Sequence, residues 1–335
     1  MKYKGVTYDI GTEYVSGALT RTGLTKELIE HDLLNIKNEL NCNSVRIYGQ
    51  DEELLILASA LALENSLNVW LSPRYINADA TATIERLSRM AVRAERLRLK
   101  YPHSEIILIV AGEASIDTPG FLEGETIYER IKNLSKPSFF IKKALGFKPR
   151  YQNDFIKFLE NLTAVVRRNF KGRVTYASAM WEDVNWSIFD FISVNLYKAS
   201  FNKSFFDRKV NQLNSMGKRL AITEFGCCSY VGADKKGPAG YFILDTTTNP
   251  PAYKQNCERS EQVQASYIID LLRIYFKANV EATFVFDFYS QQHTFNQNPD
   301  FDYDKASFGI TKSLGQNKWE PKLSFNAIAK FYKEN

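Results

Sequence analysis

The stretch RLAITEFGCCSY, residues 219–230, begins as an apolar strand and then places a carboxylate, Glu224, just before a glycine and two adjacent cysteines. Seven other short apolar runs, bounded by turn residues, recur along the chain. They cover residues 5–11, 44–49, 68–74, 105–113, 173–180, 191–197 and 282–289. Near-continuous apolar runs of this kind are typical of strands that are buried on both faces, as in a parallel sheet.

Amphipathic helices are expected in most of the gaps between these strands. Their predicted starts are Thr25, Asp51, Thr81, Tyr151 and Ser260, and a last helix is predicted over 321–333, opened by Pro321. Strands with interleaved helices predict an α/β fold, a (β/α)8 TIM barrel that forms a single domain over residues 1–335. A doubly wound open sheet is the alternative, but no Gly-rich phosphate-binding motif follows the first strand.

The connections between the predicted elements are unequal in length. Links from a helix into a strand are short, whereas long loops leave strands four, seven and eight, over residues 114–150, 227–259 and 290–320. Within the second of these, residues 239–256 carry aromatics and are expected to be ordered. A barrel that builds its site at the carboxyl ends of its strands shows this asymmetry.

Composition excludes several classes of function. The net charge of +5 is small and spread along the 335 residues, so no nucleic-acid partner is expected. No apolar stretch reaches the ~18 residues of a membrane span, and no signal peptide is recognised, which predicts a cytoplasmic protein. Four cysteines and three histidines form no cluster at ligand spacing, so neither a metal nor another cofactor is predicted. The oligomeric state stays open.

Two carboxylates are expected to meet at the mouth of the barrel. Glu113 ends strand four and Glu224 lies near the end of strand seven. Retaining glycoside hydrolysis needs such a pair, about 5–5.5 Å apart, in which one group protonates the departing oxygen and the other attacks the anomeric carbon. A structural ion pair at the barrel mouth is the alternative explanation.

The motifs VRIYG, ITEFG and a glutamate ending strand four resemble the large clan of retaining (β/α)8 glycoside hydrolases. The resemblance implies that Glu113 is the acid/base and Glu224 the nucleophile, with Arg46 orienting Glu224 and Tyr197 donating to it. Two positions depart from the clan's pattern. Gly112 stands where the clan usually has asparagine, and strand eight reads VFDFY where the clan often has a tryptophan.

A second resemblance covers nearly the whole chain. The segments VTYASAMWEDVNW, TEFGCCSYVGA and DYDKASFGITK are similar to bacterial proteins often labelled abortive infection proteins. That label implies a role in phage defence and specifies no chemistry.

Further polar and aromatic side chains at strand ends are candidates for substrate contact. The set is Asp9, Arg46, Tyr48, Arg74, Tyr75, Trp181, Glu182, Asn195, Tyr197, Asp287, Tyr289 and His293. Glu182 is also a second candidate acid, and Asp287 is expected either to bind a sugar hydroxyl or to pair with Arg74. Cys227 and Cys228 are interpreted as packing residues, because no histidine is placed to activate them.

The predicted function is therefore a retaining glycosidase or transglycosidase that acts on a small glycoside without a cofactor. A barrel that binds a sugar or nucleotide-sugar without hydrolysing it is the main alternative, motivated by Gly112. A third hypothesis has Glu113, Glu224 and Asp287 as metal ligands.

Overall fold

The computed structural model describes residues 1–136 and 147–335. Its main sheet has eight strands in the order β7-β6-β5-β4-β1-β12-β9-β8, and every pairing within it is parallel. These strands are β1 (Tyr3–Asp9), β4 (Ser44–Gly49), β5 (Asn68–Pro73), β6 (Ile106–Gly112), β7 (Arg173–Ala177), β8 (Phe191–Asn195), β9 (Arg219–Phe225) and β12 (Ala282–Val285). All eight predicted strands are thus confirmed.

The first and last strands of this order, β7 and β8, are hydrogen-bonded to each other, which closes the sheet into a barrel. The Ser178 N–H donates to the Ser193 carbonyl at 3.0 Å, and the Asn195 N–H donates to the Ser178 carbonyl at 2.8 Å. These bonds join the end of β7 to β8. The (β/α)8 barrel prediction is therefore confirmed, and the doubly wound alternative is wrong.

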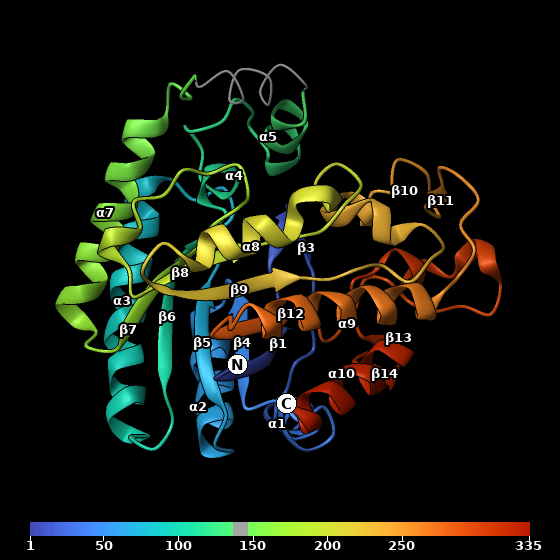
Figure 1. Ribbon diagram of the computed structural model, residues 1–335, viewed down its shortest axis with the longest axis horizontal. Coiled ribbons are helices and arrows are strands. Elements are labelled where there is room, and N and C mark those ends of the chain that lie inside the picture. The colour runs from blue at the N-terminus through green and yellow to red at the C-terminus, as the bar shows by residue number, and fades with distance from the viewer. Residues whose placement is uncertain (137–146) are drawn as a thin grey trace.

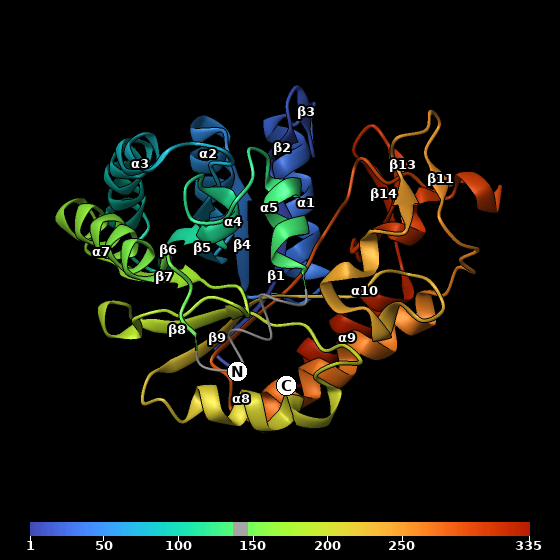
Figure 2. The ribbon, with the colours of Figure 1, turned by 90° about the horizontal axis from the view of Figure 1, so that it is seen from above.

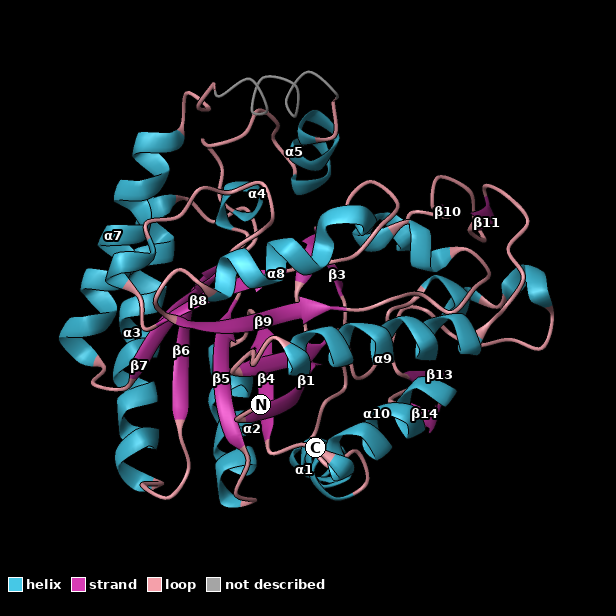
Figure 3. Ribbon diagram, in the orientation of Figure 1, coloured by secondary structure: helices cyan, strands magenta, loops and turns pink. Residues whose placement is uncertain are grey.

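Helices surround the barrel on the outside (Figure 3). They are α1 (Lys26–Asn38), α2 (Glu52–Glu64), α3 (Ala80–Lys100), α7 (Gln152–Asn169), α8 (Phe206–Asn214), α9 (Glu261–Lys277) and α10 (Leu323–Glu334). Helices α2, α3 and α7 flank one side of the sheet, and α8, α9 and α10 flank the other (Figure 1, Figure 2). No described helix is both long enough and apolar enough to cross a membrane.

The helix starts follow the capping chemistry of the sequence. The side chains of Thr25, Asp51 and Ser260 cap α1, α2 and α9 as predicted, each accepting a backbone N–H of the first turn. Helix α3 begins earlier than its predicted start, because Asp79 accepts the Ala82 N–H. Pro321 ends a strand, and α10 begins after it at Leu323.

Long segments lie at the carboxyl ends of β6, β9 and β12, as predicted. After β6 come α4 (Ala114–Asp117) and α5 (Ile127–Leu134), and part of this loop, 137–146, lies outside the described residues. After β9 come η3 (Ala233–Lys235), η4 (Gly237–Tyr241), β10 (Leu244–Asp245) and β11 (Ala252–Tyr253). After β12 come η5 (Pro299–Phe301), η6 (Tyr303–Ala306), β13 (Thr311–Gly315) and β14 (Lys318–Pro321).

Two short strands and two short 3₁₀ helices complete the described chain. A hairpin that was not predicted, β2 (Glu13–Val15) and β3 (Ala18–Leu19), follows β1. The turns η1 (Trp186–Ile188) and η2 (Lys203–Phe205) precede β8 and α8.

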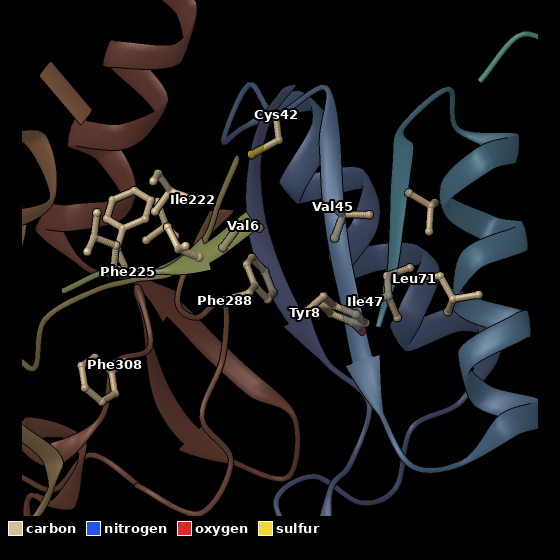
Figure 4. Packing of buried hydrophobic residues seen from close by; sticks show 14 of the residues in the cluster. Val6, Tyr8, Cys42, Val45, Ile47, Leu71, Ile222, Phe225, Phe288 and Phe308 are labelled. Atoms are coloured by element: carbon tan, nitrogen blue, oxygen red, sulfur yellow. The ribbon is translucent and has the colours of Figure 1, made fainter. Parts of the chain in front are cut away.

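Side chains alternate between the inside of the barrel and the helix layer. The inner cluster comprises Tyr3, Trp70, Ile107, Ile109, Ala177, Phe191, Ala221, Ala282 and Phe284. The outer cluster, part of which Figure 4 shows, includes Val6, Val45, Leu71 and Ile222. Because both faces are apolar, the strands read as continuous hydrophobic runs. The packed interior leaves the site to be built at one end of the barrel.

Candidate active site

A β-bulge in β9 turns Glu224 toward the mouth of the barrel. Strand β9 advances three residues, from Ile222 to Phe225, while β12 beside it advances two, and the register with β8 shifts at the same place. Strict alternation would send Glu224 outward with Ile222. The extra residue reverses this, so Phe225 packs on Tyr275 of α9, with ring centroids 5.1 Å apart, and Glu224 faces the mouth.

Glu113 is also positioned by irregular backbone. Strand β6 advances three residues, from Ile109 to Gly112, while β7 advances two. Glu113 then adopts the left-handed conformation, with φ +46° and ψ +41°, which costs a non-glycine residue about 1–2 kcal/mol. Its N–H donates to the Ala177 carbonyl at 2.9 Å. Strain of this kind is concentrated at functional sites, where the surroundings hold it in place.

One amide group connects the two carboxylates. The Asn195 Nδ2 donates to Glu113 Oε1 at 3.0 Å and to Glu224 Oε2 at 3.4 Å. These two distances together limit the separation of the two oxygens to about 6.4 Å. The orientation of the amide is set by Thr223, whose hydroxyl donates to Asn195 Oδ1 at 2.9 Å.

The two carboxylates have different environments. Glu224 accepts from the Tyr197 hydroxyl at 2.8 Å and from Arg46 Nη1 at 3.3 Å. By contrast, burial, followed by the charge of Glu224, raises the pKa of Glu113 to about 8. Glu113 thus keeps its proton at neutral pH, while Glu224 beside it accepts from a hydroxyl and a guanidinium, and this difference suits an acid beside a nucleophile.

Arg46 is held inside the barrel by several acceptors. Its Nη1 donates to the Thr223 carbonyl at 2.8 Å, and its Nη2 donates to Ser72 Oγ at 3.3 Å. Gly112 lies against the same guanidinium, because a Cβ on this glycine would be 3.4 Å from Arg46 Nη2. Arg46 is therefore fixed beside Glu224, with Gly112 packed against the same guanidinium.

Arg74 orders the wall on the Glu113 side. Its guanidinium binds the Asp117 carboxylate in a bidentate pair, at 2.8 and 3.1 Å, and its Nη2 lies 3.7 Å from Glu113 Oε2. The expected alternative, a pair between Arg74 and Asp287, is wrong. Asp117 takes that position because α4 follows Glu113 directly and returns its last residue to the mouth.

Asp9, Tyr48 and Asp287 lie together on the β1 side of the site. The side chain of Asp9 accepts the Gly11 N–H at 2.8 Å. Burial, followed by the charges of Asp9 and Asp287, raises the pKa of Tyr48. The Tyr48 ring also lies 6.1 Å from that of Phe286, which in turn lies 5.5 Å from Phe308. Phe286, directly after β12, thus offers an aromatic surface at the end of the eighth barrel strand, where the sequence has no tryptophan.

Four other residues that were predicted to contact substrate have the following partners within the protein. The Tyr75 ring packs under Arg86 of α3, 3.9 Å from the guanidinium, and so faces the helix layer. Tyr289 accepts from Ser313 and stacks on Arg21. His293 lies 3.0 Å from Ser290 Oγ, and burial lowers the pKa of its imidazole. The Trp181 indole donates to Ser115 Oγ at 3.0 Å.

Glu182 is used by the local structure. Its carboxylate accepts from the Tyr176 hydroxyl at 2.6 Å and from the backbone N–H groups of Ala179 and Ser115 at 2.8 and 3.0 Å. These bonds tie the loop after β7 to the first turn of α4. The geometry therefore assigns Glu182 to holding the loops, in place of the second acid that the sequence suggested.

Replacement of Glu182 by glutamine should test that assignment through stability. Glutamine keeps the shape but brings an amide N–H₂ toward three donors, so we expect a loss of about 2–3 kcal/mol in the free energy of unfolding. Urea denaturation followed by circular dichroism measures it. A variant of unchanged stability that nevertheless has no activity would return Glu182 to the list of candidate acids.

Other residues of the site were not predicted. Besides Asp117, Tyr14 of the β2–β3 hairpin lies with its ring 5.2 Å from the Arg74 guanidinium. Tyr241 of η4 lies near Glu113. Burial, followed by the charges of Tyr128 and Glu113, raises the pKa of Tyr241. Tyr241 belongs to the aromatic loop 239–256, which was a usable signal, whereas nothing in the sequence marked Tyr14.

The structure offers no activated thiol among Cys227 and Cys228. Both are buried, and burial raises the pKa of each thiol. Cys228 Sγ donates to the Ala306 carbonyl at 3.4 Å, which is a packing contact. Among the described residues, no three His, Cys, Asp or Glu side chains are arranged to hold a metal ion.

Comparison with known proteins finds similarity in the fold and none in the sequence. No family model and no curated protein matches the sequence, so the similarity to abortive infection proteins has no support from these comparisons. Among solved structures, the GH113 β-mannanase of Alicyclobacillus acidocaldarius has 13% identity and a TM-score of 0.59, covering 100% of this chain and 98% of its own.

Two further structures share the same architecture. A fungal β-1,4-galactanase has 13% identity and a TM-score of 0.57, covering 98% of this chain and 99% of its own. A β-glucosidase has 11% identity and a TM-score of 0.55, covering 100% and 99%. The chain therefore has the (β/α)8 fold found in these glycoside hydrolases.

Proposed function

We propose that this chain is a retaining glycoside hydrolase or transglycosidase that acts on a small glycoside, with Glu113 as acid/base and Glu224 as nucleophile. The observation that carries the proposal is the shared contact of Asn195, which limits the two carboxylate oxygens to about 6.4 Å. Inverting enzymes hold their carboxyl groups about 6.5–9.5 Å apart to admit a water molecule between them and the sugar.

In the first step a Glu224 oxygen attacks the anomeric carbon and forms a glycosyl ester. The bond from that carbon to the aglycone oxygen breaks, and the departing oxygen takes the proton of Glu113. Arg46 and Tyr197 orient the attacking carboxylate through the contacts described above. Because burial holds the proton on Glu113 at neutral pH, the acid is ready before the substrate binds.

In the second step water gives a proton to Glu113 and its oxygen attacks the anomeric carbon, which releases Glu224. A sugar hydroxyl in place of water gives transglycosylation by the same route. The fold supports this reading through its neighbours, which are a mannanase, galactanases and a glucosidase. A small substrate is favoured because the pair is largely buried: the Glu113 side chain is 17% exposed and that of Glu224 is 11% exposed.

Covalent labelling tests the proposal directly. The protein is incubated with a panel of cyclitol epoxides and 2-deoxy-2-fluoro glycosides that differ in sugar configuration, and its peptides are analysed by mass spectrometry. We expect one adduct, on the peptide that contains Glu224, and no adduct in the Glu224→Gln variant. An adduct on another carboxylate, or none from any probe, would contradict the assignment and favour a barrel that binds sugar without cleaving it.

The bridging amide should also affect the pH profile. Asn195→Ala removes a hydrogen bond that favours the charged form of Glu113, so its pKa should rise further and the alkaline limb of kcat/KM should move to higher pH. We expect kcat/KM at neutral pH to fall about 10²-fold. Thr223→Val, which keeps the amide and removes only the hydroxyl that orients it, is the matched control with a much smaller effect. An alkaline limb that does not move would refute this role.

A further inference from the structure

Within the part of the chain that the structure describes, the mouth of the barrel has more carboxyl groups than cationic side chains paired with them. Two arginines lie there, and each is already committed: Arg46 to Glu224 and Arg74 to Asp117. Glu113 keeps a proton, since burial raises its pKa to about 8. Two further carboxyl groups remain on the β1 and β12 side, those of Asp9 and Asp287.

Asp287 has no hydrogen-bond partner for its side chain within the described part of the chain. The residue as a whole is only 6% exposed. Its Oδ1 is buried and accepts no hydrogen bond. Asp9, at 5% exposed, accepts the Gly11 N–H through Oδ1. A buried carboxyl group without a partner is rare in proteins and costly, and a bound ligand that donates to it is one way to remove that cost.

The remaining cations near Asp287 are bound to other carboxylates. Lys322 lies 2.8 Å from Asp304, with both side chains fully buried, and Arg21 lies 2.6 Å from Asp32. Arg21 reaches Asp9 only at its backbone carbonyl, at 3.2 Å. No ion pair joins Asp9 or Asp287 to any cation in residues 1–136 or 147–335.

We propose that Asp287, together with Asp9, binds a protonated amino group of the sugar, so that the substrate is an amino-sugar glycoside. This inference rests on the proposed function and names the substrate class of the same site. An ammonium group has three donors and a positive charge, so it supplies the donor that Asp287 lacks and a cation that neither carboxyl group is paired with. A neutral hydroxyl would supply a donor, but it would give the two carboxyl groups no positive charge to pair with.

Binding of such a group should release a proton. In the free protein burial, followed by the charge of Asp9, raises the pKa of Asp287 well above its ordinary value. Glu224 acts in the same direction, and Lys322 and Arg21 oppose it. The ammonium takes the place of the proton, which passes to the buffer. A hydroxyl-bearing sugar would bind with the Asp287 proton in place.

The experiment is isothermal titration of the wild-type protein with methyl glycosides that carry a single amino group at C2, C3, C4 or C6, each beside its parent alcohol. Buffers of different ionisation enthalpy report the protons released. We expect at least one amine to bind tenfold or more tightly than its alcohol, with release of about one proton. Parity across the whole panel, or tighter binding of the alcohols, would overturn the inference.

Asp287→Asn is the decisive variant. It removes the ionisable group without breaking any hydrogen bond to the side chain from a described residue, so its Tm at neutral pH should equal or exceed that of the wild type. We expect the preference for the amine to fall to parity and the proton release to vanish. Asp270→Asn makes the same chemical replacement at an exposed position of α9 and should keep both. A preference that survives in Asp287→Asn refutes the assignment.

The binding measurement does not depend on turnover, so the two proposals fail separately. Labelling of Glu224 by neutral probes, together with no preference for amines, would leave the glycosidase in place and remove the amino sugar. A preference for amines that depends on Asp287, without labelling, would establish the amino-sugar site and remove the hydrolysis.

Discussion

Replacement of Glu224 by glutamine should abolish turnover, with a loss on the order of 10⁴-fold or more in kcat. The amide keeps the shape of the side chain and still accepts from Tyr197 and Arg46, but it cannot form the glycosyl ester. Arg46 keeps Ser72 and the Thr223 carbonyl as acceptors, so the fold should survive. Initial rates on the glycoside identified by labelling measure the loss, and circular dichroism measures the fold.

The control for this variant is Glu281→Gln. Glu281 directly precedes β12 at the opposite end of the barrel and pairs with Arg219 at 3.4 Å, so its replacement should leave kcat unchanged. Activity that persists in folded Glu224→Gln would remove the nucleophile from β9. It would also leave the β9 bulge without a catalytic explanation.

The second large effect concerns Glu113 and its proton. Because burial and the Glu224 charge raise the pKa of Glu113 to about 8, the acid is protonated below that pH and is lost above it. We therefore expect kcat/KM to be nearly constant from neutral pH to just below pH 8, and to fall about tenfold per pH unit above pH 8. A rate measured from pH 5 to 10 with a substrate that has a poor leaving group gives this profile.

Glu113→Gln should remove that alkaline limb and lower kcat/KM by about 10²-fold to 10⁴-fold for poor leaving groups. Aryl glycosides with acidic phenols need little protonation, so formation of the glycosyl enzyme from them should be nearly unaffected. Added azide can then attack the anomeric carbon without a general base and should restore turnover. A variant that loses both substrate types equally would show that Glu113 acts in some other way.

Part of this site follows from residue pattern alone. Apolar runs with short links before them and long loops after them predicted a barrel with its chemistry at one end, and Glu113 and Glu224 stand at the ends of two such runs. Capping residues such as Thr25 and Asp51 act within one helical turn, so their effect was visible in the sequence.

Partners between distant segments were less accessible. Arg74 was expected to have Asp287 as an alternative partner, but the chain places Asp117 there through the short helix α4. Glu182 looked like a free acid in a loop, yet three donors from two different loops converge on it. Such contacts depend on how loops return to the barrel, which local pattern does not encode.

The sequence by itself determined the strands, most helix starts and the two strands that carry the glutamates, because these depend on local chemistry and on burial of both sheet faces. Only the tertiary structure decided which way the glutamates point. A strand that is apolar on both faces gives no periodic signal of direction, so the bulge that turns Glu224 inward cannot be read from RLAITEFG. The bulge is defined by the register of β9 against β8 and β12. In that register Asn195 of β8 lies between the two carboxylates.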